Sequence, residues 1–331
     1  MGQAPSYSGE EYHSYYFSLY SSALRNQQCL LPDVGIDESL LRYSGTDSNA
    51  VLQAFSTEML NSVPGYVGRL GSILGSKTPI PNAVGLGALV ISLIIEIAIK
   101  SSSRPRDNTY SLLRRVFGEE KASSVQDTMS EVLERHDMFK DNNQRLREEM
   151  RRLEQQLSYH LTILRSSLVR DGQMSSRGFK IWVNGAAFHV QLLIHEARLN
   201  IQTGRPASEY LNPINTAIDS HMRTLDSLLQ EYKTFKINSK MFTYQPPVNL
   251  VYAATPSICT MANNEVQNCQ VHFENNYNPC GHPGMNSAYM DIVYSNYEPI
   301  TGLKSYFLNV KNNVNSLIHQ RGTFTVPSAA G

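Results

Sequence analysis

The chain has 331 residues with 29 Lys+Arg and 29 Asp+Glu, so its formal net charge at pH 7 is zero. A balanced charge creates no global basic field, and we therefore expect no nucleic-acid partner. Hydrophobic residues make up 41% of the chain and charged residues 18%, which is typical of a folded protein and not of a disordered one. At roughly 100–200 residues per domain, the length fits about two domains.

The first residues carry a lipidation pattern. Gly2 to Ser6 fit the M-G-x-x-x-[ST] motif, in which the glycine amine is myristoylated after Met1 is removed. One myristoyl chain holds a protein at a membrane only marginally, so we expect a second membrane signal elsewhere. The N-terminus has neither the basic start nor the apolar stretch of a secretory signal peptide, and the chain contains no Asn-x-Ser/Thr acceptor. We therefore expect a cytoplasmic protein that lies at a membrane or inserts into it conditionally.

Four glycines follow two predicted N-terminal helices, which cover residues 9–27 and a segment that begins near Ser48 and ends at Pro64. The glycines recur at steps of three, three and four residues, so on a helix they form one smooth ridge where another helix can approach closely. This predicted helix-packing ridge consists of Gly65, Gly68, Gly71 and Gly75. A proline-containing turn over residues 77–82 comes next.

The most apolar run of the chain, residues 83–99, follows this turn and contains one charge, Glu96. Its 17 residues cover about 25 Å as a helix, slightly less than the ~30 Å hydrocarbon core of a bilayer. Three interpretations stay open: a central core helix, a permanent membrane span, or a helical hairpin over about 65–100 that is buried first and enters lipid later. For the hairpin, the predicted membrane-insertion residues are Leu86, Leu89, Val90, Ile91, Leu93, Ile94 and Ile95.

A heptad pattern then extends from Val125 to Leu164, with apolar residues at alternating steps of four and three. No Pro or Gly occurs between Lys121 and Arg170, so the pattern predicts one very long helix of ~45–50 residues over about 121–170, roughly 75 Å in length. We expect this helix to give the molecule an elongated shape.

Two more amphipathic helices are predicted at about 177–203 and 207–236, and their short connections require antiparallel neighbours. From residue 237 onward the chain is rich in Asn, Tyr and Cys, and its last predicted helix covers about 300–320. The predicted fold is mainly α, with an elongated helical bundle over 1–236 that includes the apolar hairpin. A small irregular or β-containing cap over 237–331 completes it.

Motifs of catalytic chemistry are missing from the sequence. The segment from Gly71 to Thr78 resembles a phosphate-binding loop, but Ser76 stands where the motif requires glycine. His195 and Glu196 are not followed by the second histidine of a helical zinc protease, because Leu199 occupies its position. We expect a protein that is not an enzyme and has no cofactor.

The four cysteines are too few for a disulfide scaffold of this size, so we expect reduced thiols. A structural zinc and an oxidised cysteine pair are the alternatives, since three of the thiols and two imidazoles fall within 24 residues. The candidate zinc ligands are Cys259, Cys269, His272, Cys280 and His282.

This organisation resembles that of α-helical pore-forming or membrane-remodelling proteins, in which a helical bundle sequesters an apolar hairpin. The leading hypothesis is a non-enzymatic, membrane-active protein that is tethered through Gly2, inserts the hairpin and forms homo-oligomers. One alternative is a myristoylated coiled-coil scaffold that recruits a helical protein partner to a membrane through its heptad helix. A further alternative is a myristoylated viral protein that builds the particle or carries it into a cell.

Overall fold

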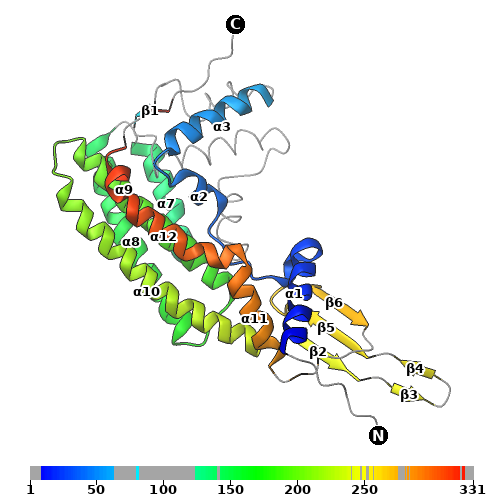
Figure 1. Cartoon of the computed structure of the whole chain (residues 1–331). Helices are drawn as coiled ribbons and strands as arrows, with labels where there is room; N and C mark the ends of the chain where they lie inside the picture. Colours follow the sequence, from blue (N-terminus) through cyan, green and yellow to red (C-terminus); the bar gives the residue numbers. More distant parts are fainter. Residues whose placement is uncertain are drawn as a thin grey trace.

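The computed structural model (Figure 1) describes residues 9–62, 80–81, 124–139, 142–239, 241–246, 248–250, 253–255, 257–274, 280, 282, 284–320 and 323–324. The N-terminal elements are α1 (Gly9–Asn26), η1 (Gln28–Leu30), α2 (Glu38–Tyr43), α3 (Ser48–Ser62) and the short strand β1 (Ile80–Pro81). The central elements are α7 (Ser124–Phe139), α8 (Asn143–Val169), α9 (Ser176–Ile201) and α10 (Ser208–Asn238). The C-terminal elements are β2 (Phe242–Gln245), β3 (Val248–Leu250), β4 (Ala253–Thr255), β5 (Ile258–Ala262), β6 (Gln270–Glu274), α11 (Met285–Asn296), α12 (Glu298–Ile318) and β7 (Thr323–Phe324).

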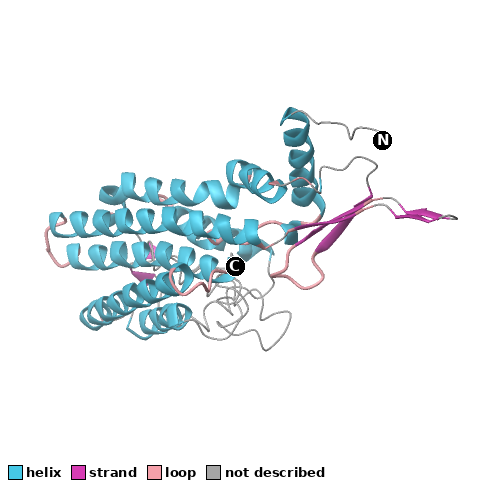
Figure 2. Cartoon of the chain, turned by 90° about the horizontal axis from the view of Figure 1, so that it is seen from below, coloured by secondary structure: helices cyan, strands magenta, loops and turns pink. Residues whose placement is uncertain are grey.

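Helices α7, α8, α9, α10 and α12 form an elongated bundle, and a small antiparallel sheet extends from one end of it (Figure 2). The mainly α fold with a small β-containing C-terminal region is therefore confirmed. Successive helices in the bundle run antiparallel, as the short connections predict: Leu168 near the end of α8 lies against Gly178 near the start of α9, and Phe179 near the start of α9 packs on Tyr232 near the end of α10. Among the described helices, none combines the length and apolarity that a bilayer span requires.

The centre of the bundle is α9, which packs against α7, α8, α10 and α12. Eighteen of its 26 residues are buried, so this helix is surrounded on nearly all sides. Its start is fixed locally, because the Ser175 hydroxyl accepts a hydrogen bond from the Gly178 amide at 3.0 Å. At Gly185 the missing side chain lets α7 and α8 approach α9 closely: a Cβ there would lie within 3 Å of side-chain atoms of Val125 and Leu161.

The prediction of one very long helix over 121–170 is wrong. Helix α7 ends at Phe139, α8 begins at Asn143, and the two helices pack against each other. The Asn142 side chain caps α8 by accepting from the Arg145 amide at 3.0 Å, so a helix start is encoded here without Pro or Gly. Folding back lets the two halves of the heptad pattern bury each other, and Thr128 Oγ1 lies 2.8 Å from His160 Nδ1 across the pair.

The apolar residues of the heptad pattern, which we call the heptad seam, pack inside the bundle. Those with the most complete burial are Val125, Val132, Leu146, Met150, Leu153 and Leu157, each at most 1% exposed. In this structure they are core residues of the bundle and do not present a surface to another helical protein.

The C-terminal sheet has the strand order β2-β5-β6, with all strands antiparallel. Strands β3 and β4 form a separate hairpin. Helix α1 packs against α11 beside this sheet, whereas α12 packs against α9 and α10. The last helix of the predicted cap over 237–331 is thus a member of the bundle, and the first helix of the chain lies with the sheet.

Candidate functional site

The residues predicted to reach lipid lie outside the described part of the chain. These residues are the acylation site Gly2, the ridge residues Gly65, Gly68, Gly71 and Gly75, and the insertion residues Leu86, Leu89, Val90, Ile91, Leu93, Ile94 and Ile95. For the predicted hairpin over about 65–100, the structure describes the helices before and after it, α3 and α7, and two residues of its predicted turn.

That turn is held by the other end of the chain. Strand β1, which falls inside the predicted 77–82 turn, pairs antiparallel with β7: Ile80 lies opposite Phe324 and Pro81 opposite Thr323. Helix α3 also contacts β7. The connection between the two predicted arms is therefore held by the segment that follows α12.

A buried arginine fixes the end of α12, just before β7. Arg198 of α9 is 3% exposed, and its Nε donates to the Leu317 carbonyl at 2.6 Å. Its Nη2 donates to Gln320 Oε1 at 2.7 Å, and Gln320 Nε2 donates to the Gly45 carbonyl at 3.1 Å. Burial lowers the pKa of Arg198 to about 9. The central helix thus holds the end of α12, the element that precedes the strand paired with the predicted turn.

The prediction of reduced thiols is wrong. Cys29 is bonded to Cys269, and Cys259 is bonded to Cys280. The three cysteines of the candidate zinc site are thereby divided between two disulfides, so the structure does not bring them together as thiolate ligands. Among the described residues, no group of three His, Cys, Asp or Glu side chains has the arrangement of a metal site.

The two histidines of that candidate set have other contacts. His272 of β6 lies with its Nδ1 2.8 Å from Thr260 Oγ1 of β5. The ring of His282 lies 4.6 Å from the ring of Tyr12, measured between centroids. Both histidines are exposed.

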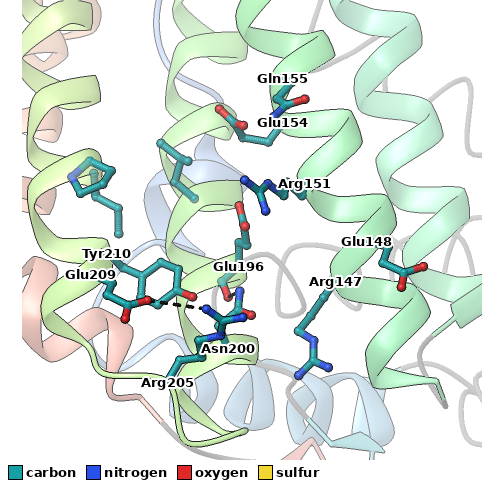
Figure 3. Close-up of a pocket in the computed structure, with 13 residues that line it drawn as sticks. Arg147, Glu148, Arg151, Glu154, Gln155, Glu196, Asn200, Arg205, Glu209 and Tyr210 are labelled. Atoms are coloured by element: carbon teal, nitrogen blue, oxygen red, sulfur yellow. Dashed lines mark hydrogen bonds and ion pairs between the residues drawn. The ribbon is translucent and has the colours of Figure 1, made fainter.

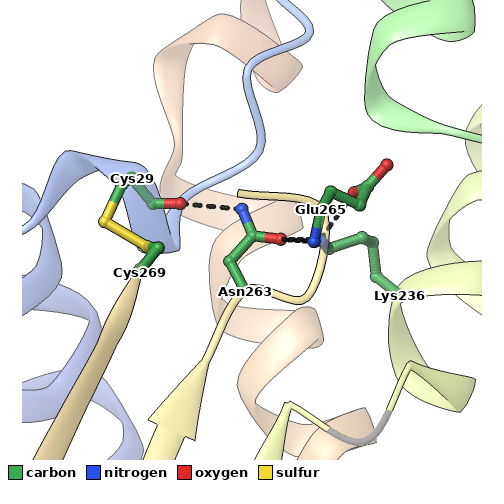
Figure 4. The surroundings of a disulfide bond; sticks show 5 residues. All are labelled: Cys29, Lys236, Asn263, Glu265 and Cys269. Carbon is green, nitrogen blue, oxygen red and sulfur yellow. Dashed lines mark hydrogen bonds and ion pairs between the residues drawn. A yellow bond between two sulfur atoms is a disulfide. The ribbon is translucent and has the colours of Figure 1, made fainter. Parts of the chain in front are cut away.

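A polar cluster in which Asn263 and Lys236 are buried lies beside the Cys29–Cys269 disulfide (Figure 4). Asn263 donates from Nδ2 to the Cys29 carbonyl at 2.7 Å and accepts at Oδ1 from Lys236 Nζ at 3.1 Å. Lys236 also donates to Glu265 Oε2 at 3.0 Å. The cluster therefore joins the N-terminal segment, the β5–β6 connection and α10.

Glu265 also caps the start of α9. Its Oε1 accepts from the Ser176 amide at 2.7 Å, and its Oε2 accepts from the Ser176 hydroxyl at 2.5 Å. Burial raises the pKa of Glu265, but the hydrogen bonds from Ser176 and the charge of Lys236 outweigh burial and lower it. The carboxylate is thus held in its charged form at the positive end of the helix.

A groove of about 500 Å³ lies between α8, α9 and α10 (Figure 3). Its charged residues are of both signs and are Arg147, Glu148, Arg151, Glu154, Glu196, Arg205 and Glu209. Burial raises the pKa of Glu196, the charge of Glu154 adds to this, and Arg151 opposes it. Glu196 therefore takes up a proton at a higher pH than an ordinary glutamate does.

A chain of hydrogen bonds leads from this groove into the core. Glu154 Oε1 lies 2.8 Å from His189 Nε2, and His189 Nδ1 lies 3.0 Å from His221 Nε2. Because a carboxylate only accepts, His189 carries its hydrogen on Nε2, and its Nδ1 accepts from His221. Burial lowers the pKa of His221 to about 3, and the neighbouring imidazole of His189 contributes to the lowering. The arrangement keeps His221 neutral inside the bundle.

No protein family model, curated protein or solved structure matches this chain.

Two groups of residues were missed by reasoning from the sequence. His189 and His221 belong to different helices, and neither the periodicity of α9 nor that of α10 indicates that they meet. The pairing of Cys29 joins residues 240 positions apart, and no local spacing carries it. A signal did exist for the α7–α8 connection, since Asn142 and Asn143 are residues that favour helix caps.

Proposed function

We propose that this protein is a non-enzymatic, membrane-active helical protein that is tethered through an acyl group on Gly2. It inserts the apolar segment 83–99, with the glycine ridge of residues 65–75 as the first arm of a helical hairpin. The observation that carries the proposal is that α9 already occupies the centre of the bundle, with 18 of its 26 residues buried. This observation supports a role for the most apolar run of the chain other than that of the central core helix.

The anchored turn supports the same proposal. Residues 80–81 pair with 323–324, and Arg198 holds the end of α12 next to this pair. A two-residue pairing is short compared with the strands of a typical sheet, so it is a weak attachment. Lipid that binds the apolar arms better in the inserted state than in the folded state would shift the equilibrium toward release.

The burial of the heptad seam argues against the competing scaffold function. It requires the heptad seam to receive a partner helix, but Val132, Met150 and Leu157 are fully buried between α7, α8 and α9. A partner could use this seam only by opening the bundle.

Dye leakage from liposomes tests the proposal. We expect the oxidised full-length chain to release dye from vesicles of phosphatidylcholine and anionic lipid, and Leu93→Glu to abolish the release, because a charge at the centre of a membrane helix costs roughly 3 kcal/mol or more. The matched control is Leu308→Glu, since Leu308 of α12 is 44% exposed and its substitution adds the same charge on the bundle surface. Equal leakage by both variants would contradict the proposal. So would liposomes that stay intact with the wild-type chain.

A second function is favoured by the two disulfides together with the Gly2 motif. N-myristoylation acts on a chain made in the cytosol, whereas disulfides persist in oxidising environments such as cell and virion surfaces. A myristoylated viral protein that builds the particle or carries it into a cell meets both conditions. Intact-mass analysis of the protein from its native source tests this: an acyl group without free thiols supports it, and free thiols at Cys29 and Cys269 contradict it.

A further inference from the structure

A second, smaller groove lies between α1 and α11, with a volume of about 310 Å³. This volume falls near the lower end of the roughly 300–1,000 Å³ of small-molecule pockets. The described residues that line it come from these two helices and are Gly9, Tyr12, His13, Tyr16, Ala288, Asp291, Ile292, Ser295 and Asn296.

The groove has an apolar floor and a polar rim. Tyr16 and Ile292 are buried, and Tyr12 and Ala288 are half-buried beside them. Asp291, Ser295 and Asn296 are exposed along one edge. A floor of aromatic and aliphatic groups with polar groups at the edge suits an unbranched hydrocarbon chain whose polar attachment stays in water.

The position of this groove in the chain indicates its occupant. Gly9, the first residue of α1, is itself part of the lining, and Gly2 precedes it by seven residues. Seven extended residues span at most about 25 Å, so a group attached to Gly2 lies within reach of the groove that Gly9 lines.

We propose that the groove between α1 and α11 binds the myristoyl chain of Gly2 when the protein is away from membranes. This inference rests on the acylation in the proposed function and adds where the acyl chain is stored. Because a single myristoyl chain binds bilayers only marginally, a shallow protein groove competes with lipid for it. Membrane docking then begins when the chain leaves the groove.

The experiment compares acylated and non-acylated full-length protein, made with and without an N-myristoyltransferase and checked by intact mass. We expect acylation to raise the thermal midpoint of the wild type by about 3 °C or more, because a ligand bound only to the folded state stabilises it. Ala288→Phe fills the groove and should remove this increase. Ala54→Phe, at an exposed position on α3, is the matched control and should keep it.

Liposome binding gives the complementary readout. With Leu93→Glu added to both proteins to remove insertion of residues 83–99, acylated Ala288→Phe should bind with a constant near the ~10⁴ M⁻¹ of a free myristoyl chain, and acylated protein with Ala288 intact about tenfold more weakly. Equal binding by the two proteins would overturn the inference. So would the same thermal shift in both phenylalanine variants, or no shift in the wild type.

A photoreactive group at the end of the acyl chain tests the wild type without any substitution. Crosslinks to peptides that contain residues 285–296 are expected, and crosslinks confined to other peptides would overturn the inference. Free myristate added to non-acylated protein is a further comparison. If it raises the thermal midpoint while acylation of Gly2 does not, the groove binds free fatty acid instead, and the inference is overturned. If the transferase leaves Gly2 unmodified, both the acyl tether and the binding of the acyl chain in the groove are refuted. The leakage experiment with Leu93→Glu still tests the insertion of residues 83–99 in that case.

Discussion

The imidazole rings of His189 and His221 meet inside the helical bundle, with 3.0 Å between Nδ1 of the first and Nε2 of the second. Trp182 and Phe307 lie against the ring of His221, and Glu154 binds the far side of His189. The pair therefore contacts a carboxylate through His189, while aromatic rings lie against His221. A proton added to His221 would face the neighbouring imidazole and little water.

The first prediction is a loss of stability in mild acid that depends on His221. Its folded-state pKa is about 3, below the ordinary value of about 6.5, so the unfolded chain takes up the proton first. The contribution of His221 to stability is therefore complete above pH 6.5 and declines as the pH falls from 6.5 toward 3. Between pH 7 and pH 5 this linkage amounts to about 2 kcal/mol of unfolding free energy.

Urea unfolding at the two pH values measures this loss. His221→Gln keeps hydrogen-bonding capacity but does not titrate, so its loss between pH 7 and pH 5 should be smaller than that of the wild type by about 2 kcal/mol. His319→Gln removes an exposed histidine and should leave the pH dependence unchanged. The prediction fails if His221→Gln loses as much stability as the wild type.

The second prediction compares the two disulfides. In the chain-entropy description, a crosslink stabilises by restricting the unfolded chain, and more so when it closes a longer loop. Cys29–Cys269 has a sequence separation of 240 and Cys259–Cys280 one of 21. The expected contributions to unfolding free energy are about 5 and 3 kcal/mol respectively.

Two double alanine variants make this comparison, one for each cysteine pair, with unfolding by urea at neutral pH. Removing Cys29–Cys269 should cost about 2 kcal/mol more than removing Cys259–Cys280. It should also weaken the attachment of the N-terminal segment, so proteolysis near Gln28 should accelerate in that variant only. Equal losses would show that loop length does not determine the contribution of these bonds.

The accuracy of the sequence predictions follows from how local each signal is. The helices expected at 177–203 and 207–236 are observed as α9 and α10 with boundaries within two residues, because apolar periodicity and nearby caps determine them. The 121–170 helix failed because periodicity continues through Asn142, and only the cap reveals the interruption.

The candidate sites depended on contacts that no local pattern records. Proximity in the sequence groups Cys259 and Cys280 with Cys269, yet Cys269 pairs with Cys29 from the other end of the chain. In the sequence, His221 is one residue of an amphipathic helix, and only the fold shows that it contacts His189. Helix faces are encoded every three or four residues, whereas pairings between elements depend on the whole topology.

The third prediction concerns Lys236, whose side chain is 1% exposed and lies 3.0 Å from Glu265. Lys236→Met keeps the length of the side chain but leaves Glu265 and Asn263 Oδ1 without this donor. Removing one partner of a buried ion pair costs several kcal/mol, and since Glu265 is about one fifth exposed we expect a loss of roughly 2–3 kcal/mol.

The double variant Lys236→Met/Glu265→Gln isolates the charge in this loss. It removes the unpaired carboxylate, so it should recover roughly 1 kcal/mol or more of the unfolding free energy that Lys236→Met loses. Lys311→Met is the matched control, because Lys311 pairs with Asp219 at 2.6 Å on the surface, with side-chain exposures of 35% and 41%. Surface pairs contribute about 0–1 kcal/mol, so chemical denaturation should rank the control well below Lys236→Met. A double variant no more stable than Lys236→Met would mean that the lysine acts through packing alone and that its charge does not hold Glu265 at the start of α9.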